Sequence, residues 1–127
     1  MKEQFVTYEI AVKLRELGFN EECLGFYKTT LGDNVPELHI IKCNYNSGKY
    51  ITIPEDFHTD APLWQQVIDW LREEHNINLY LPKSVYGGYV YVVDSKYSDT
   101  IYNDYYDARE QAILKTIELC KKNYHKK

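Results

Sequence analysis

The chain has 127 residues, of which 44% are hydrophobic and 27% are charged. These proportions are close to those of ordinary globular domains, so the composition excludes a disordered chain, a collagen and a coiled coil. No apolar run approaches the roughly 20 residues that cross a bilayer, and the first residues lack the apolar stretch of a signal peptide. We therefore expect one cytoplasmic domain over residues 1–127.

The net charge of −4 hides an uneven distribution along the chain. Residues 1–107 carry 9 basic and 17 acidic side chains, a charge of −8, whereas residues 108–127 carry 6 and 2, a charge of +4. An acidic body repels phosphates, so extended nucleic-acid binding is not expected. The short basic tail, Lys121–Lys127, complements the dipole of a C-terminal helix and keeps the chain soluble.

The three cysteines, Cys23, Cys43 and Cys120, are widely spaced and form no Cys-x-x-Cys pair. This spacing excludes a secreted disulfide scaffold and a zinc ribbon. His39 and Cys43 are four residues apart in a predicted strand, which separates them by about 13 Å and prevents one metal ion from binding both. The sequence therefore predicts no metal, no disulfide and no bound cofactor, and a melting temperature that neither chelator nor reductant changes.

A first helix is predicted over Val6–Leu17, because its apolar residues recur at helical spacing on one side. Gly18 fits a left-handed C-cap, which lets Phe19 pack back onto the last turn. Two segments rich in aromatic and branched residues follow, Cys23–Thr30 and Leu38–Tyr45. They are predicted to pair as an antiparallel hairpin.

Turn-forming residues at Gly32–Pro36 separate these two strands, and a second turn leads into a short third strand, Lys49–Ile53, which Pro54 ends.

Asp60 is predicted to be the N-cap of a second helix, over Leu63–His75. The apolar residues of this helix cover an arc of roughly 160°, wider than the stripe of a helix that packs on one side. Trp64, Ile68 and Leu71 are therefore expected to be buried.

Two further strands, Ile77–Leu81 and Tyr89–Val93, are predicted to form a hairpin whose loop spans Pro82–Gly88. Residues 94–100 are expected to be a loop, and an edge strand at Ile101–Tyr102 is left open. Asn103 or Asp104 is predicted to cap the last helix. The buried stripe of that helix is predicted to be Tyr105, Ala108, Ala112, Ile113, Thr116, Leu119 and Cys120.

The predicted order of elements is α-β-β-(β)-α-β-β-α. Runs of strands between helices indicate an α+β fold, in which helices pack on a small antiparallel sheet.

Three stretches carry a resemblance to a known family: Glu16–Cys23, Ala61–His75 (APLWQQVIDWLREEH) and Tyr105–Ile113 (YYDAREQAI). They resemble small uncharacterised proteins of phages and prophage-like regions of Bacteroidetes, and the likeness covers almost the whole chain. Members often have proline before the cysteine, where this chain has Glu22. The family has no assigned activity, so the resemblance implies a setting, with host interaction or counter-defence as the expected role, and no mechanism.

Catalytic motifs are absent from the sequence. The chain has no Gly-x-Ser-x-Gly elbow, no glycine-rich phosphate loop and no His-Glu-x-x-His pair. His58 lies between Asp56 and Asp60, which would suit acid–base chemistry, but Asp is also the residue expected beside a helix start. We therefore expect that the protein is not an enzyme.

Tyrosine is the one unusual feature of the composition, with 13 residues, 8 of them within residues 80–106. In the predicted strand there, Tyr89 and Tyr91 share one face, and Val90 and Val92 form the face expected to meet the core. A tyrosine face in water is a contact surface with a low entropic cost, suited to a protein or to a stacked nucleotide base. Tyrosine is also simply a good strand former.

The leading hypothesis is an accessory protein that binds a protein partner. The alternative is a small-molecule or nucleotide binder, such as a sequestering protein, that uses the tyrosine-rich hairpin. A homodimer is expected as well, because the second helix and Leu114 leave apolar surface to cover; the competing explanation is that residues 54–59 or 94–100 fold over these faces. The predicted contact residues are Tyr86, Tyr89, Tyr91, Tyr97, Tyr102, Trp70 and Leu114.

Overall fold

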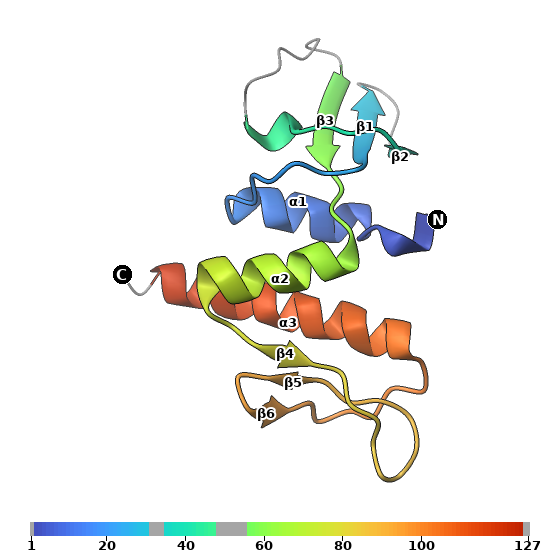
Figure 1. Cartoon of the computed structure of the whole chain (residues 1–127), viewed down its shortest axis with the longest axis vertical. Helices are drawn as coiled ribbons and strands as arrows, with labels where there is room; N and C mark the ends of the chain where they lie inside the picture. The colour runs from blue at the N-terminus through green and yellow to red at the C-terminus, as the bar shows by residue number, and fades with distance from the viewer. Residues whose placement is uncertain (1, 31–34, 48–55, 126–127) are drawn as a thin grey trace. The chain divides into compact units, whose positions relative to one another are not determined.

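The structure is a computed structural model that describes residues 2–30, 35–47 and 56–125 (Figure 1). The described part of the chain contains three α-helices and two small antiparallel sheets of three strands each, which confirms the predicted α+β class. The chain divides into two compact units, Met1–Val67 and Ile68–Lys127, and their boundary lies inside the second helix. Within the described ranges, no helix is long and apolar enough to cross a membrane.

The first unit begins with a short 3-10 turn, η1 (Lys2–Gln4), followed by helix α1 (Tyr8–Glu16). The Thr7 hydroxyl accepts a hydrogen bond from the Ile10 N–H at 3.4 Å and caps this helix. The helix therefore starts two residues after Val6, the predicted start.

The end of α1 has the predicted left-handed cap. Gly18 has a φ of 93°, and its N–H bonds the Arg15 carbonyl at 3.0 Å. The Phe19 N–H bonds the Leu14 carbonyl at 2.9 Å, and the Phe19 ring is buried. These two bonds make a Schellman motif, in which glycine supplies the left-handed residue.

The first sheet has the strand order β2-β1-β3, formed by β1 (Phe26–Thr30), β2 (Glu37–His39) and β3 (Asp56–Asp60). Strand β1 pairs antiparallel with both neighbours, so the predicted hairpin is confirmed. Strand β2 is shorter than the predicted Leu38–Tyr45, and a 3-10 turn, η2 (Tyr45–Ser47), lies at the end of that segment.

The third strand of the described sheet, β3, lies in a segment for which the sequence predicted no strand. The predicted strand Lys49–Ile53 and most of the predicted turn at 32–36 lie outside the described residues. Strand β3 instead ends at Asp60, which was predicted to cap the second helix. The Asp60 carboxylate is buried and accepts hydrogen bonds from the N–H groups of Tyr45 and Asn46 at 2.9 and 3.0 Å. Asp60 therefore caps the η2 turn, a partner that is distant in sequence.

Helix α1 covers one face of this sheet. The Tyr27 hydroxyl donates to the Val6 carbonyl at 2.6 Å, and Arg15 donates to the Thr59 hydroxyl at 2.7 Å. Tyr27 and Thr59 are cross-strand partners, so both bonds lie on the same face. The apolar core of the unit contains Phe5, Val6, Ile10, Ala11, Leu14, Phe19 and Phe26.

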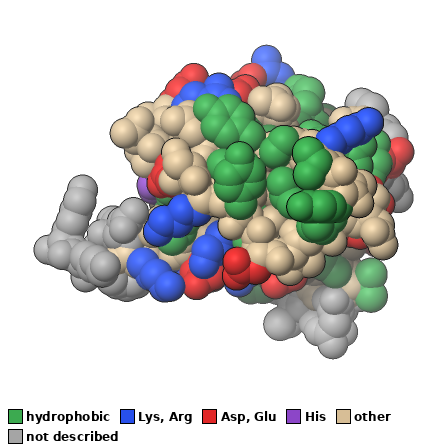
Figure 2. All heavy atoms as spheres, turned by 90° about the horizontal axis from the view of Figure 1, so that it is seen from below, with side chains coloured by type: hydrophobic (Ala, Val, Ile, Leu, Met, Phe, Trp, Pro, Cys, Tyr) green, Lys and Arg blue, Asp and Glu red, His purple; other side chains and the backbone are tan. Residues whose placement is uncertain are grey.

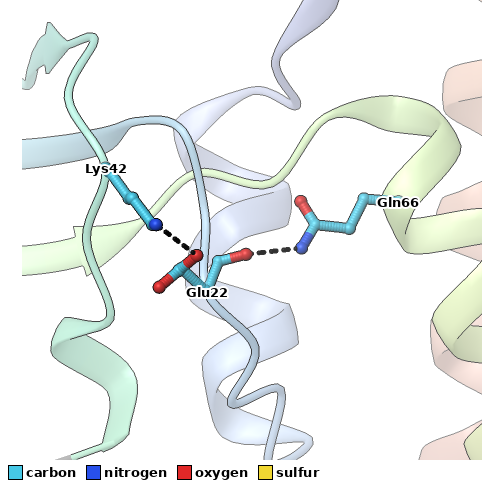
Figure 3. A network of polar contacts seen from close by, with 3 residues as sticks. All are labelled: Glu22, Lys42 and Gln66. Atoms are coloured by element: carbon cyan, nitrogen blue, oxygen red, sulfur yellow. Dashed lines mark hydrogen bonds and ion pairs between the residues drawn. The ribbon is translucent and has the colours of Figure 1, made fainter.

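A polar network joins three segments of the first unit (Figure 3). The Lys42 ammonium lies 3.3 Å from a carboxylate oxygen of Glu22, and the Gln66 side-chain amide donates to the Glu22 backbone carbonyl at 2.8 Å. Glu22 thus contacts Lys42 through its side chain and Gln66 through its backbone carbonyl.

Helix α2 (Trp64–His75) is buried along its wide apolar arc, at Trp64, Val67, Ile68, Trp70 and Leu71. Trp64, Ile68 and Leu71 are all buried, which confirms the expectation for these residues. The Trp64 indole N–H donates to the Glu3 carbonyl at 3.0 Å.

The second sheet has the strand order β4-β5-β6, formed by β4 (Leu79–Tyr80), β5 (Val92–Val93) and β6 (Lys96–Tyr97). Strands β4 and β5 lie inside the predicted strands and pair antiparallel as predicted.

Strand β6 corrects the prediction that residues 94–100 are a loop. Asp94 and Ser95 have φ values of 49° and 70° and form a two-residue turn between β5 and β6. Two positive φ values match the twist of a hairpin, but the sequence signal for that turn is Asn-Gly or Asp-Gly. Asp-Ser does not carry this signal, so the sequence did not reveal the third strand.

Helix α3 (Tyr105–His125) is capped by Asp104, whose carboxylate accepts a hydrogen bond from the Tyr106 N–H at 2.8 Å. Ala108, Ala112, Ile113, Thr116 and Cys120 are buried as predicted. Leu119 is half-buried, Tyr105 is partly exposed, and Ile117 is a buried residue that the predicted stripe omitted.

Candidate binding surface

The sheet of the second unit has one buried and one exposed row of side chains. Leu79 of β4 and Val93 of β5 are cross-strand partners and both are buried. Helix α3 packs against β5. In the other row, Val92 pairs with Tyr80 on one side and with Tyr97 on the other. Tyr80 and Tyr97 are 59% and 71% exposed. Because cross-strand partners share a face, two exposed tyrosines flank Val92 on the open side.

The structure does not separate this hairpin into the predicted tyrosine face and valine core, because Tyr89, Val90, Tyr91 and Val92 are all half-buried. Tyr89 is half-buried and meets the Tyr105 ring edge-on at 5.6 Å, and Tyr91 is half-buried and stacks on Tyr102 at 6.2 Å. Burial raises the pKa of the Tyr91 hydroxyl. Other tyrosine rings therefore cover part of both Tyr89 and Tyr91.

The tip of the loop between β4 and β5 carries two strongly exposed apolar side chains. Val85 and Tyr86 are 92% and 87% exposed. The Ser84 N–H bonds the Gly88 carbonyl at 2.9 Å, and the Gly87 N–H bonds the Ser84 carbonyl at 3.1 Å. These bonds close the loop, so its tip is held by its own backbone.

A group of aromatic rings and one cation lies at the start of α3. Tyr105 and Tyr106 meet edge-on at 5.7 Å, and the Arg109 guanidinium lies 5.7 Å and 5.0 Å from their ring centres. Burial lowers the pKa of Arg109, while the two tyrosines and Asp104 oppose this change. A guanidinium stays charged in proteins, so the group combines exposed aromatic surface with a positive charge.

Trp70 and Leu114 are not among the exposed side chains of the second unit. Trp70 is only 6% exposed in the chain itself, and its ring meets His75 edge-on at 4.9 Å. Leu114 is half-buried. The apolar residues of α2 are therefore already covered, which removes Trp70 from the predicted contact set.

The remaining predicted residues divide into two groups. Tyr89, Tyr91 and Tyr102 are brought together as half-buried supports, whereas Tyr86 and Tyr97 are exposed. Sequence reasoning missed five further exposed side chains in the same tyrosine-rich segment. We call the exposed set the tyrosine surface, which consists of Tyr80, Val85, Tyr86, Tyr97, Ile101, Tyr105 and Tyr106.

Charges of both signs surround the tyrosine surface. Lys83 and Lys96 are exposed, as are Asp94 and Asp99. Figure 2, which looks at the molecule from the side on which β4, β5 and β6 are drawn in Figure 1, shows neighbouring groups of hydrophobic side chains with basic and acidic ones between them. The surface therefore has no field of a single sign to attract a polyanion.

The sequence also suggested His58, with Asp56 and Asp60, as a candidate acid–base cluster. In the structure, Asp60 is engaged by the η2 backbone, and the His58 ring stacks on Tyr45 with 4.3 Å between ring centres. The Asp56 side chain lies outside the described part. Among the described residues, no group of three or more His, Cys, Asp or Glu side chains could hold a metal ion.

Comparisons with protein-family models, with curated proteins and with solved structures find no match to this chain. A functional proposal therefore rests on the surface itself.

Proposed function

We propose that this chain is a small phage-type accessory protein, not an enzyme, that binds a protein partner through the tyrosine surface. The observation that carries the proposal is the exposure of seven large apolar side chains within one short segment of the second unit. Soluble proteins leave single apolar residues exposed, but gathered ones mark interaction sites. Tyrosine also loses little conformational entropy on binding, which favours it in contact surfaces.

The backbone beneath the tyrosine surface supports this proposal. Tyr89 and Tyr102 are bonded to each other, and Tyr97 lies in a paired strand. Side chains on a fixed base bind with a smaller entropic cost than those on a mobile segment. The surface therefore suits recognition of a folded partner.

The resemblance to phage and prophage proteins supports the setting of the proposal: the cytoplasm of a host cell, with host interaction or counter-defence as the role. A host or phage protein is then the partner. A second copy of the chain is the other partner we propose, in a homodimer built on the same surface.

Substitutions on the surface test the proposal. Wild-type protein and a Tyr86→Ser/Tyr97→Ser variant are used as baits in an extract of a bacterial host, with Ile41→Ser as the control. Ile41 is a similarly exposed apolar residue of the first unit. A partner that wild-type and Ile41→Ser retain and the tyrosine variant loses is the expected result. Equal retention by all three baits would contradict the proposal.

Light scattering on a size-exclusion column tests the homodimer separately. A mass twice that of the 15.1 kDa chain, which Tyr97→Lys reduces to the monomer mass, is expected for a dimer on this surface. A monomer mass across the micromolar range would exclude the second copy as the partner.

Arg109 favours one alternative, a nucleotide-binding protein. Its guanidinium lies against Tyr106, an exposed ring, so a base-stacking face and a phosphate-binding cation are close together. A thermal-shift screen separates the two functions, because a ligand at 100 times its dissociation constant stabilises a protein by about 2.7 kcal/mol. A shift with a nucleotide that Arg109→Ala abolishes would favour the alternative.

A further inference from the structure

Two cysteines of the first unit lie directly opposite each other. The Cys23 N–H bonds the Cys43 carbonyl at 2.8 Å, and the Cys43 N–H bonds the Cys23 carbonyl at 2.9 Å. Antiparallel residues that exchange both bonds have Cα atoms about 5.5 Å apart, with side chains on one face. This separation lies within the range of about 4.4–6.8 Å that disulfides span. The backbone therefore already has the spacing that a disulfide needs.

The two thiols are reduced and buried, and each donates to a different group. The single proton of the Cys43 thiol is shared between the Gly25 carbonyl at 3.1 Å and the Asp60 carboxylate at 3.3 Å. The Cys23 thiol donates to the Glu21 carbonyl at 3.4 Å. The two sulfur atoms can meet if both side chains rotate, and the backbone pairing need not change.

The segments that carry the two cysteines are joined a second time at their preceding residues. Lys42 and Glu22 form the ion pair at 3.3 Å described above (Figure 3). Both side chains of this pair are exposed, so the pair adds little to stability. The ion pair shows that the two segments are also adjacent at residues 22 and 42, next to the cysteines.

We propose that Cys23 and Cys43 are a redox-responsive pair, which a peroxide oxidises to an intramolecular disulfide that withdraws the Cys43 thiol from Asp60. A thiolate first displaces hydroxide from the peroxide and becomes a sulfenic acid, and the hydroxide takes up the proton that the thiol released. The second sulfur then displaces the sulfenic hydroxyl, which leaves as water with the second thiol proton. Two thiols and one hydrogen peroxide thus give one disulfide and two waters.

Asp60 connects this reaction to the structure around it. Its carboxylate accepts hydrogen bonds from the Cys43 thiol and from the N–H groups of Tyr45 and Asn46. A disulfide has no S–H, so oxidation removes one of these donors from a buried carboxylate. The η2 turn, which the same carboxylate holds, is therefore the element that responds.

The surroundings make the reaction slow in neutral solution. Burial, with a further contribution from Asp60, raises the pKa of Cys43 to about 12, and burial raises the pKa of Cys23 as well. Only the thiolate attacks a peroxide, so oxidation accelerates as the pH rises. The pair therefore responds to sustained exposure to peroxide. Because both thiols are buried, the oxidant must be small enough to reach them.

Mass spectrometry after peroxide treatment tests the proposal on the full chain. Wild-type protein and Cys120→Ser, which keeps the pair, are expected to lose two hydrogen atoms and to yield a peptide in which Cys23 and Cys43 are linked. Cys23→Ser is expected to yield no intramolecular link. A chain that keeps both thiols, or that acquires sulfinic acid or intermolecular links in place of this one, would overturn the proposal.

Amide hydrogen exchange tests the connection through Asp60 without a substitution. Oxidised wild-type protein should exchange the Tyr45 and Asn46 amides about tenfold faster than the reduced protein, because the carboxylate that holds them has lost a charge-assisted bond. Amides of α1 that bond only within the helix serve as the internal control and should not change. Unchanged exchange at Tyr45 and Asn46 in a fully linked sample would also overturn the proposal.

Discussion

Tyr89 and Tyr102 exchange two backbone hydrogen bonds of 2.7 Å each, although neither residue belongs to a strand of the second sheet. The edge strand that the sequence left open at 101–102 is therefore a single bridge. The Val90 N–H also bonds the Pro82 carbonyl at 3.1 Å. The loop that carries Val85 and Tyr86 is thus closed at its base, and its stability can be tested.

Gly88 and Gly87 provide a matched pair of substitutions in this loop. Both have positive φ values, 75° and 92°, so alanine at either costs about 1–2 kcal/mol of backbone strain. A Cβ at Gly88 would in addition lie 2.5 Å from the Tyr102 carbonyl oxygen, whereas one at Gly87 meets open space. We expect Gly88→Ala to lower the free energy of unfolding clearly more than Gly87→Ala in denaturant melts. Equal losses would mean that residues 88 and 102 are not in close contact.

Trp64 provides a test of the core. Its ring is buried and its indole N–H is bonded to the Glu3 carbonyl, so Trp64→Ala should lower the free energy of unfolding by about 3–5 kcal/mol. Glu73→Ala, an exposed change on the same helix, is the control and should cost little. A loss below about 1 kcal/mol for Trp64→Ala, in the same melts, would contradict the burial of this ring.

Features that depend on neighbouring residues were predictable from the sequence. Gly18 closes α1 and Asp104 caps α3, because each satisfies backbone groups only a few residues away. The capping chemistry of Asp60 was visible too, but its partners are residues 45 and 46, which a local pattern cannot identify. Strand β6 was missed for a similar reason, since two paired residues give no periodicity to read.

The candidate site shows the same limit. The concentration of tyrosine in residues 80–106 located the segment. Which tyrosines are exposed depends on the register of β5 against β4 and β6 and on contacts of Tyr89 and Tyr91 with Tyr105 and Tyr102. None of these contacts follows from alternation within one strand, so alternation alone could not separate the exposed tyrosines from the half-buried ones.

The position of the unit boundary leads to a prediction about cooperativity. Residues 67 and 68 lie inside α2, so separating the two units would interrupt a continuous helix. We expect one unfolding transition, in which far-ultraviolet circular dichroism and tryptophan fluorescence give the same midpoint, as for a single domain over residues 1–127. Two transitions, or midpoints that differ between the probes, would show that the units unfold separately.

The buried thiols lead to a prediction about alkaline pH. Burial raises the pKa of Cys120 to about 11, with a smaller contribution from Asp94, and raises the pKa of Cys43 to about 12. An unfolded thiol titrates near pH 8.5. Below that pH both states hold the proton, and above it the folded state binds more protons than the unfolded state. The free energy of unfolding should therefore fall as the pH rises from about 9 toward 11.

Cys120→Ala isolates one thiol in this pH dependence. The variant lacks one group with a raised pKa, so its free energy of unfolding should fall less steeply with pH than that of the wild type, whatever its stability at pH 7. Glu118→Ala is the control: this exposed neighbour on α3 has a pKa lowered by Lys122, far below the alkaline range, so its curve should run parallel to that of the wild type. Denaturant melts between pH 7 and pH 10.5 give the slope of the free energy of unfolding against pH for each protein. Identical slopes for Cys120→Ala and wild type would mean that the Cys120 thiol reaches water in the folded chain.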